Sequence, residues 1–220
     1  MLKPYRLNYK LIILSLYLSV NAHTITLTEN NHVSIKHTIS SSTASKFISD
    51  IEKIEKKSIY IYINSPGGSV HEGEKIIQYM EYKKQTNYTL LCIAHRAHSM
   101  AFHIYQHCTH RYVLPSSTIM QHQISLEING QLQNIQNYIK TIEQINQRFI
   151  EIESKKLKIS KDLYKSRIST DWWLYGNEIV DEKAGDILIS AIGCHKNLMK
   201  NNTDIVVGSE IIIVSDCPLI

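Results

Sequence analysis

Ser99 stands where a side chain can take part in catalysis. It lies between a short apolar run, residues 90–94, and a segment of helical character. A serine at such a junction places its hydroxyl at the positive end of a helix, and the N–H of the next residue, Met100, points the same way. An ordinary helix N-cap has the same sequence pattern. Catalysis and capping are therefore both open interpretations of Ser99 from this segment alone.

A second stretch suited to chemistry is the turn that contains Gly67 and Gly68. The β-branched and aromatic run 59–63 predicts a core strand before it, and Pro66 with the two glycines ends that strand abruptly. Successive glycines let backbone N–H groups approach a ligand or a developing oxyanion without a side chain in the way. A surface turn is the simpler alternative, so the rest of the chain decides.

The elements that must position these residues alternate between strands and helices. β-Branched and aromatic runs predict strands, and apolar residues at spacings of three and four predict helices. The predicted strands are residues 23–27, 59–63, 90–94, 111–114 and 118–121, with His122 directly after the last. The predicted helices are residues 43–57, 70–84, 132–152, 160–167 and 176–184. Residues 170–173 are predicted to form a turn, and residues 205–207 and 211–214 a hairpin.

The helix predicted over residues 132–152 carries a long apolar stripe. Its members are Leu132, Ile135, Ile139, Ile142, Ile145, Phe149 and Ile152. A stripe of this length on a compact domain favours a helix that projects and pairs with another subunit. Packing of the helix on its own sheet is the alternative.

The chain of 220 residues suits one α/β domain. Its first residues place Lys3, Arg6 and Lys10 before an apolar run and end in Ala22, which is the layout of a signal peptide. We therefore expect residues 1–22 to be a signal or targeting segment and residues 23–220 to be a single domain. A buried first helix and an uncleaved membrane anchor are the alternatives, and the apolar run is short for an anchor, which needs about 20 residues.

Charge and cysteine content exclude several classes of function. Without the leader, the 24 Lys and Arg become 21 against 20 Asp and Glu, and no basic stripe suggests nucleic acid as a partner. The four cysteines, at positions 92, 108, 194 and 217, are too few and dispersed for a disulfide scaffold, although a lumenal compartment would permit a bridge. His103, His107 and His110 raise a metal site as an alternative. No glutamate follows His103 and no cysteine pair has ligand spacing, so we expect no metal.

Three segments together resemble the proteolytic subunit of the ATP-dependent Clp protease, the ClpP family of serine peptidases. They are residues 61–68 (IYINSPGG), 97–101 (AHSMA) and 111–123 (RYVLPSSTIMQHQ). Each motif is short, but they occur in the family's order, with the long helix after the histidine. The resemblance covers residues 58–186.

The resemblance implies a catalytic triad. The family's serine nucleophile falls on Ser99, its general base on His122, and the acid that orients the base on Asp171. A serine hydroxyl is a poor nucleophile at neutral pH, so it needs a base within reach and a carboxylate that holds the base's tautomer. The oxyanion donors fall on the backbone N–H groups of Gly68 and Met100.

The resemblance also implies the fold and the partners. The implied fold is α/β, the ClpP/crotonase-like spiral of β-β-α units with a projecting handle helix. The implied particle consists of stacked rings of this chain, heptameric in the family, which meet through the handle and hold the triad in its active geometry. It would hydrolyse peptides, and unfolded proteins delivered by a Clp-type AAA+ unfoldase. No cofactor is expected in this chain, which has no Gly-x-x-x-x-Gly-Lys phosphate loop, so ATP would be used by the partner unfoldase.

Some positions depart from the family's pattern. His98 and Ala101 flank the serine where the family has small residues and a glycine, which predicts a more crowded or more polar pocket wall. Lys183 replaces a glycine near the end of the last helix. Relatives work in bacterial cytoplasm or inside organelles, whereas the leader predicts entry into the secretory pathway. A plastid-like organelle is one destination that reconciles the two.

Three other functions are alternatives to the peptidase. A non-catalytic ring subunit would keep the fold and lose the triad, but all three residue types are present. A membrane-associated signal-peptide-degrading peptidase would fit the leader, but that family uses a serine–lysine pair and no lysine stands at His122. Acyl-CoA enzymes of the crotonase fold also use backbone oxyanion holes, yet they would not need Ser99, His122 and Asp171 together.

Overall fold

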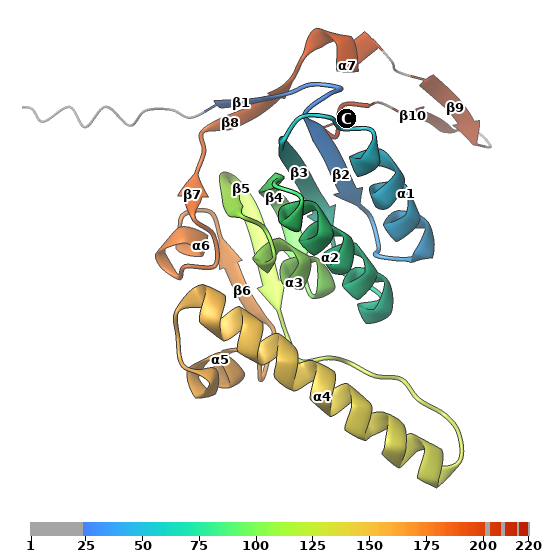
Figure 1. Cartoon of the computed structure of the whole chain (residues 1–220), viewed down its shortest axis with the longest axis vertical. Coiled ribbons are helices and arrows are strands. Elements are labelled where there is room, and N and C mark those ends of the chain that lie inside the picture. The colour runs from blue at the N-terminus through green and yellow to red at the C-terminus, as the bar shows by residue number, and fades with distance from the viewer. Residues whose placement is uncertain (1–23, 201–202, 208–209, 215, 220) are drawn as a thin grey trace, which may run out of the picture.

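A mixed sheet with the strand order β2-β3-β4-β5-β6 runs through the middle of the fold (Figure 1). The computed structural model describes residues 24–200, 203–207, 210–214 and 216–219, so the expected leader lies outside the described residues. The strands are β2 (His32–Lys36), β3 (Ser58–Ser65), β4 (Thr89–His98), β5 (His110–Gln121) and β6 (Trp172–Tyr175). The first four are parallel, β6 runs antiparallel to β5, and the short β7 (Ile187–Leu188) pairs in parallel with β5.

Helices cover one face of this sheet. They are α1 (Ser41–Glu52), α2 (Val70–Gln85) and α3 (Met100–Gln106) (Figure 1). Side chains alternate along β3 as a two-sided strand requires, since Ile61 and Ile63 lie in the core under the helices while Tyr62 packs on the opposite face. The predicted central strands and helices are confirmed, and the chain has a mixed α/β fold.

Smaller elements cover the other face. The predicted first strand is present as β1 (Thr24–Leu27), but it pairs with β8 (Ala191–Cys194) and stays outside the central sheet. The hairpin is also present, formed by β9 (Thr203–Val207) and β10 (Glu210–Val214) after α7 (Lys196–Lys200). Two disulfides, Cys92–Cys108 and Cys194–Cys217, use all four cysteines.

β5 is one continuous strand, although the sequence predicts two strands interrupted by Pro115. A proline cannot donate a backbone hydrogen bond to a neighbouring strand. Here the side chain of Ser117 supplies hydrogen bonds near the proline. Ser117 Oγ accepts from the N–H of Leu114 at 2.7 Å and donates to the C=O of Ala94. The β4–β5 register shifts at this point, between Ala94 and Arg96. The chain therefore passes the proline without leaving the sheet.

The last third of the domain differs most from prediction. Residues 170–173 were predicted to form a turn, but residues 172–175 form β6, because they pair with the end of β5. The helix predicted over residues 176–184 is reduced to α6 (Glu178–Asp181). Lys183 just beyond it has φ of 60°, in the left-handed region that favours glycine. The missing glycine at this position is thus a real departure, and the helix ends there nevertheless.

α4 (Leu132–Leu157) projects from the body of the domain, as expected of a handle helix (Figure 1). Its 26 residues span about 39 Å at a rise of 1.5 Å per residue. Phe149, Ile150 and Leu157 near its carboxyl end are buried against the domain, where α5 (Lys161–Arg167) also packs. Leu132 and Ile139 near its amino end are exposed. In the described part of the chain, no helix is both long and apolar enough to cross a membrane.

An ion pair fixes the start of β5 to the segment before β7. The Arg111 guanidinium, 3% exposed as a residue, donates to both Asp186 carboxylate oxygens and to the C=O of Ala184. Burial alone would raise the pKa of Asp186, but the Arg111 charge outweighs it and holds the pKa below its ordinary value. The pair therefore stabilises the fold above pH of about 4, and this stabilisation is lost as pH falls through the lowered pKa.

We predict that Asp186→Ala lowers the free energy of unfolding by about 2 kcal/mol at neutral pH, because it leaves the Arg111 charge buried and unpaired. The value is below the roughly 3–5 kcal/mol of a fully buried pair, since Asp186 is partly exposed. Urea unfolding at several pH values measures the difference, which should shrink below pH of about 4. Asp181→Ala, at an exposed carboxylate on α6, is the control, and equal stability of the two variants would contradict the prediction.

Candidate active site

Strand register brings the predicted catalytic positions to one end of the sheet. β4 and β5 are parallel, His98 pairs with Met120, and the N–H of Ser99 donates to the C=O of Met120 at 2.8 Å. In the antiparallel β5–β6 pair, Gln121 lies opposite Trp172. His122 directly follows Gln121, and Asp171 directly precedes Trp172. Ser99, His122 and Asp171 therefore flank strand ends at the same end of the sheet.

The backbone at Ser99 has an unusual conformation. Its φ is 53° and its ψ is −123°, values that cost a non-glycine residue about 1–3 kcal/mol and that cluster at functional sites. The serine stands directly before α3, yet its side chain makes no capping hydrogen bond to the helix. An ordinary N-cap would make that bond, so capping does not explain Ser99.

The glycine turn after β3 lies directly against Ser99. Gly67 has φ of 97°, and a Cβ at this position would come within 2.7 Å of the Ser99 Cβ. Gly68 has φ of 145°, and a Cβ there would lie 2.4 Å from the C=O oxygen of Ile39. The turn and Ile39 exchange two backbone hydrogen bonds, Ile39 N–H to Gly67 C=O and Ser69 N–H to Ile39 C=O. Neither uses the N–H of Gly68, so this pairing holds the turn without occupying that donor.

A hollow of about 60 Å³ opens over these elements and is lined by Gly68, Ser99, Met100 and His122. Its apolar walls come from Val70, Ile124, Phe149, Ile150 and Ile168. Its polar walls come from Gln121, Gln123, Ser125, Asn146 and Glu153. A serine, an imidazole and two backbone N–H groups around one hollow are the parts that acyl transfer requires.

The side chains of the predicted triad make no hydrogen bonds with one another in the part of the chain that the structure describes. Asp171 is exposed and does not line the hollow. Within the described residues, no hydrogen bond joins Ser99 to His122 or His122 to Asp171. His122 is held through its backbone instead, because its N–H donates to Gln121 Oε1 at 3.1 Å. The three predicted triad residues flank neighbouring strand ends, but no hydrogen bond joins them within the described residues.

His98 does not crowd the pocket as the sequence predicted. Its side chain is directed to β5 and β6, where Nε2 lies 3.0 Å from Thr118 Oγ1 and the ring meets Trp173 edge-on at 4.8 Å. Burial, and secondarily the charge of Arg96, lower the pKa of His98 to about 4. It is therefore neutral at physiological pH and outside the hollow. The polar character of the pocket wall comes from other residues.

Those residues include a buried polar cluster that sequence reasoning missed. Glu153 is 1% exposed, and its carboxylate accepts from His103 Nδ1 at 2.9 Å, Gln121 Nε2 at 2.7 Å and the Tyr164 hydroxyl at 2.5 Å. A signal was present in the sequence. Glu153 follows Phe149 by four residues and precedes Leu157 by four, so it carries a charge along the buried face of α4.

The histidines that suggested a metal site, His103, His107 and His110, do not share a common partner. His103 contacts Glu153, and His107 Nδ1 lies 3.0 Å from Glu81 Oε1 on α2. His110 is exposed at the start of β5. Across the part of the chain described, no three His, Cys, Asp or Glu side chains meet in an arrangement that could hold a metal ion.

Comparison with known protein families places the chain among serine-peptidase-like sequences. The family model described as Clp protease matches residues 19–185. The matched region includes the sheet from β2 to β6, the projecting α4, and each of the residues Gly68, Ser99, Met100, His122 and Asp171.

We predict that Gly68→Ala slows covalent labelling of Ser99 by a fluorophosphonate by about 100-fold or more, because the new methyl group displaces a predicted oxyanion donor. The labelling rate, followed by mass spectrometry of the modified peptide, measures the effect. Gly193→Ala is the matched control, since a Cβ there meets no atom within 4 Å. If Gly68→Ala folds and labels at the same rate as the control, the Gly68 N–H is not part of an oxyanion hole.

Proposed function

Because this chain belongs to the Clp protease family, we propose that it is a serine endopeptidase with Ser99 as nucleophile, His122 as general base and Asp171 as the acid that orients the base. The family match supports a ClpP-like peptidase. The assignment of Ser99 and His122 is supported by the hollow that both residues line together with Gly68 and Met100.

In the proposed mechanism, Ser99 Oγ attacks the carbonyl carbon of the scissile peptide bond and His122 takes the hydroxyl proton. The negative charge that develops on the carbonyl oxygen is stabilised by the N–H groups of Gly68 and Met100. His122 then gives its proton to the leaving amine. Water, activated by the same imidazole, hydrolyses the acyl-enzyme and restores Ser99.

Apolar walls around the hollow favour substrates with an apolar side chain next to the scissile bond. Val70, Ile124, Phe149 and Ile150 are among the residues of these walls, and burial of one large aliphatic side chain contributes about 1.5–3 kcal/mol. We therefore propose unstructured peptides and unfolded proteins as substrates. Their delivery by a Clp-type AAA+ unfoldase, which would consume the ATP, is part of the same proposal.

A non-catalytic ring subunit is the second candidate. One observation favours it, namely that Ser99, His122 and Asp171 form no hydrogen bonds with one another within the described residues. The missing hydrogen bonds have an alternative explanation, which is that a single subunit lacks its ring neighbours. The exposed apolar residues near the amino end of α4 are consistent with a missing neighbour. Labelling of the assembled protein separates the two candidates.

We predict that the assembled protein hydrolyses short peptides alone, and that Ser99→Ala abolishes hydrolysis while leaving the size of the particle unchanged. A fluorophosphonate should modify Ser99 in the wild-type protein, as located by mass spectrometry. Degradation of a folded protein should require the unfoldase and ATP. Full peptide hydrolysis by Ser99→Ala would exclude Ser99 as nucleophile, and absence of labelling in an assembled sample would favour the non-catalytic subunit.

Assembly gives a separate prediction. Ile139 lies on the uncovered half of α4 and is 37% exposed in the single subunit. Ile139→Glu should therefore leave the subunit folded but separate stacked rings into single rings or smaller species, and lower peptide hydrolysis with the triad untouched. Analytical ultracentrifugation and a peptide assay on the same samples measure both effects. Lys140→Glu, which adds the same carboxylate at an exposed polar position, is the control. Equal particle size and turnover in both variants would show that α4 does not join rings.

A further inference from the structure

Glu153 connects α4 to three other elements of the domain. Its donors are His103 on α3, Gln121 at the end of β5 and Tyr164 on α5. A buried carboxylate is costly unless hydrogen bonds replace its lost hydration. Both oxygens of Glu153 have such bonds, so the position of the carboxylate is strongly specified.

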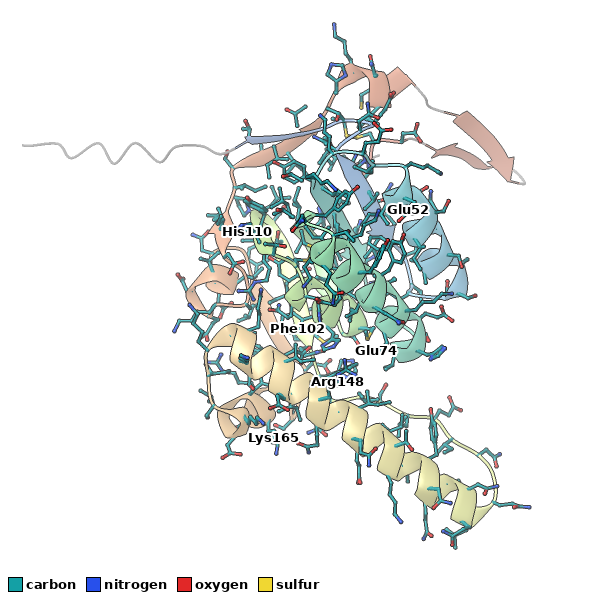
Figure 2. All side chains as sticks on the ribbon, viewed as in Figure 1. Glu52, Glu74, Phe102, His110, Arg148 and Lys165 are labelled. Carbon is teal, nitrogen blue, oxygen red and sulfur yellow. A yellow bond between two sulfur atoms is a disulfide. The ribbon has the colours of Figure 1, made fainter. Side chains whose placement is uncertain are left out.

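The charges around this cluster are matched. His103 Nε2 lies 3.6 Å from Glu74 Oε1 on α2, an ion-pair distance beyond hydrogen-bond range, and its ring stacks on Phe149 at 3.6 Å. Glu74 in turn faces Arg148 of α4 at 4.0 Å (Figure 2). Burial alone would lower the pKa of His103, but the Glu153 and Glu74 carboxylates outweigh it and raise the pKa. The two carboxylates therefore favour the cationic form of His103, whose charge opposes that of the buried Glu153.

Gln121 extends the cluster to the predicted catalytic base. A carboxylate only accepts hydrogen bonds, so Glu153 requires the NH₂ group of the Gln121 amide to face it. The opposite end of the amide, Oε1, must then face the other way, and it accepts the N–H of His122 at 3.1 Å. Glu153 thus determines how Gln121 is turned, and Gln121 holds the backbone of His122.

The same carboxylate reaches the helix that begins at the predicted nucleophile. His103 lies in the first turn of α3, and its backbone N–H donates to the C=O of Ser99 at 3.2 Å. Glu153 is therefore connected to Ser99 through His103 and to His122 through Gln121.

We propose that Gln121 is a positioning residue for His122, and that Glu153 acts on His122 through the Gln121 amide. This inference rests on the proposed serine peptidase activity and deepens it. It assigns to α4 a role inside its own subunit, in addition to any role in assembly.

The test begins with Gln121→Met and Glu153→Gln, each close in size to the residue it replaces. Either change should lower kcat for a short peptide by about 10- to 100-fold, because a small displacement of a catalytic group is enough for such a loss. KM should stay within about threefold if the role is to position His122. Loss of a pocket wall would instead raise KM and leave kcat unchanged, and that result would overturn the proposal.

A double variant tests whether Glu153 acts through Gln121. With both residues changed, kcat should be no lower than in Gln121→Met alone, because the contact through which Glu153 is proposed to act on His122, the one with Gln121, is already lost. Losses that multiply would mean that Glu153 acts on the site independently, which contradicts the proposal. Glu151→Gln is the matched control. It removes an exposed α4 carboxylate whose ion pair with Lys161 at 3.1 Å is also exposed, and kcat should not change.

Folding and assembly of each variant are checked by circular dichroism and ultracentrifugation. If Glu153→Gln does not assemble, Tyr164→Phe takes its place in the cycle, since it removes one donor to the other carboxylate oxygen. A wild-type protein that neither hydrolyses peptides nor labels at Ser99 would overturn the proposed function and this inference with it. Normal wild-type hydrolysis with an unchanged kcat in Gln121→Met would overturn the inference alone.

Discussion

The register between β4 and β5 is the constraint on which the site depends. Ala94 pairs with Val113 before the irregularity and Arg96 with Thr118 after it, so the offset between paired residues grows by three. Without this change, Ser99 would lie beside Thr118, four residues before His122, instead of beside Gln121, which directly precedes His122. The Ser117 hydroxyl supports the shifted register because it bonds to both strands there, to Leu114 of β5 and to Ala94 of β4. A small polar side chain two residues after a proline thus helps to decide which residues lie side by side at the end of the sheet.

Sequence patterns predicted the parts of the fold whose structure is decided locally. The strand at residues 59–63, the helix after the glycine turn and the long α4 all have periodicities that their own side chains establish. β6 has no such autonomy, because Trp172 and its neighbours become a strand only by pairing with the distant β5. Pro115 was predicted to interrupt the strand because a local pattern shows only that proline lacks an N–H donor. The hydrogen bonds of Ser117 that compensate for it cross to another strand and cannot be found by local pattern.

The candidate site divides along the same line. Motif order identified Ser99, His122 and the glycine turn, and the structure brings these residues to one hollow. The orientation of side chains was less predictable. His98 is adjacent to the serine in sequence but faces Thr118 and Trp173, while Glu153 is distant in sequence and reaches the pocket wall. Which of two neighbours enters a pocket depends on backbone direction at the end of a strand, and the strained φ of Ser99 shows that this direction is not regular there.

The disulfide between Cys194 and Cys217 encloses a segment near the carboxyl end in a covalent loop. The two residues are 23 positions apart, and the hairpin of β9 and β10 lies between them. A single backbone cut anywhere in this covalent loop leaves both new ends attached to the domain. Under oxidising conditions a single proteolytic cut in the segment would therefore not detach its outer part. In a reducing environment the same cut would release everything beyond it, so the durability of this end of the molecule depends on the redox state of its surroundings.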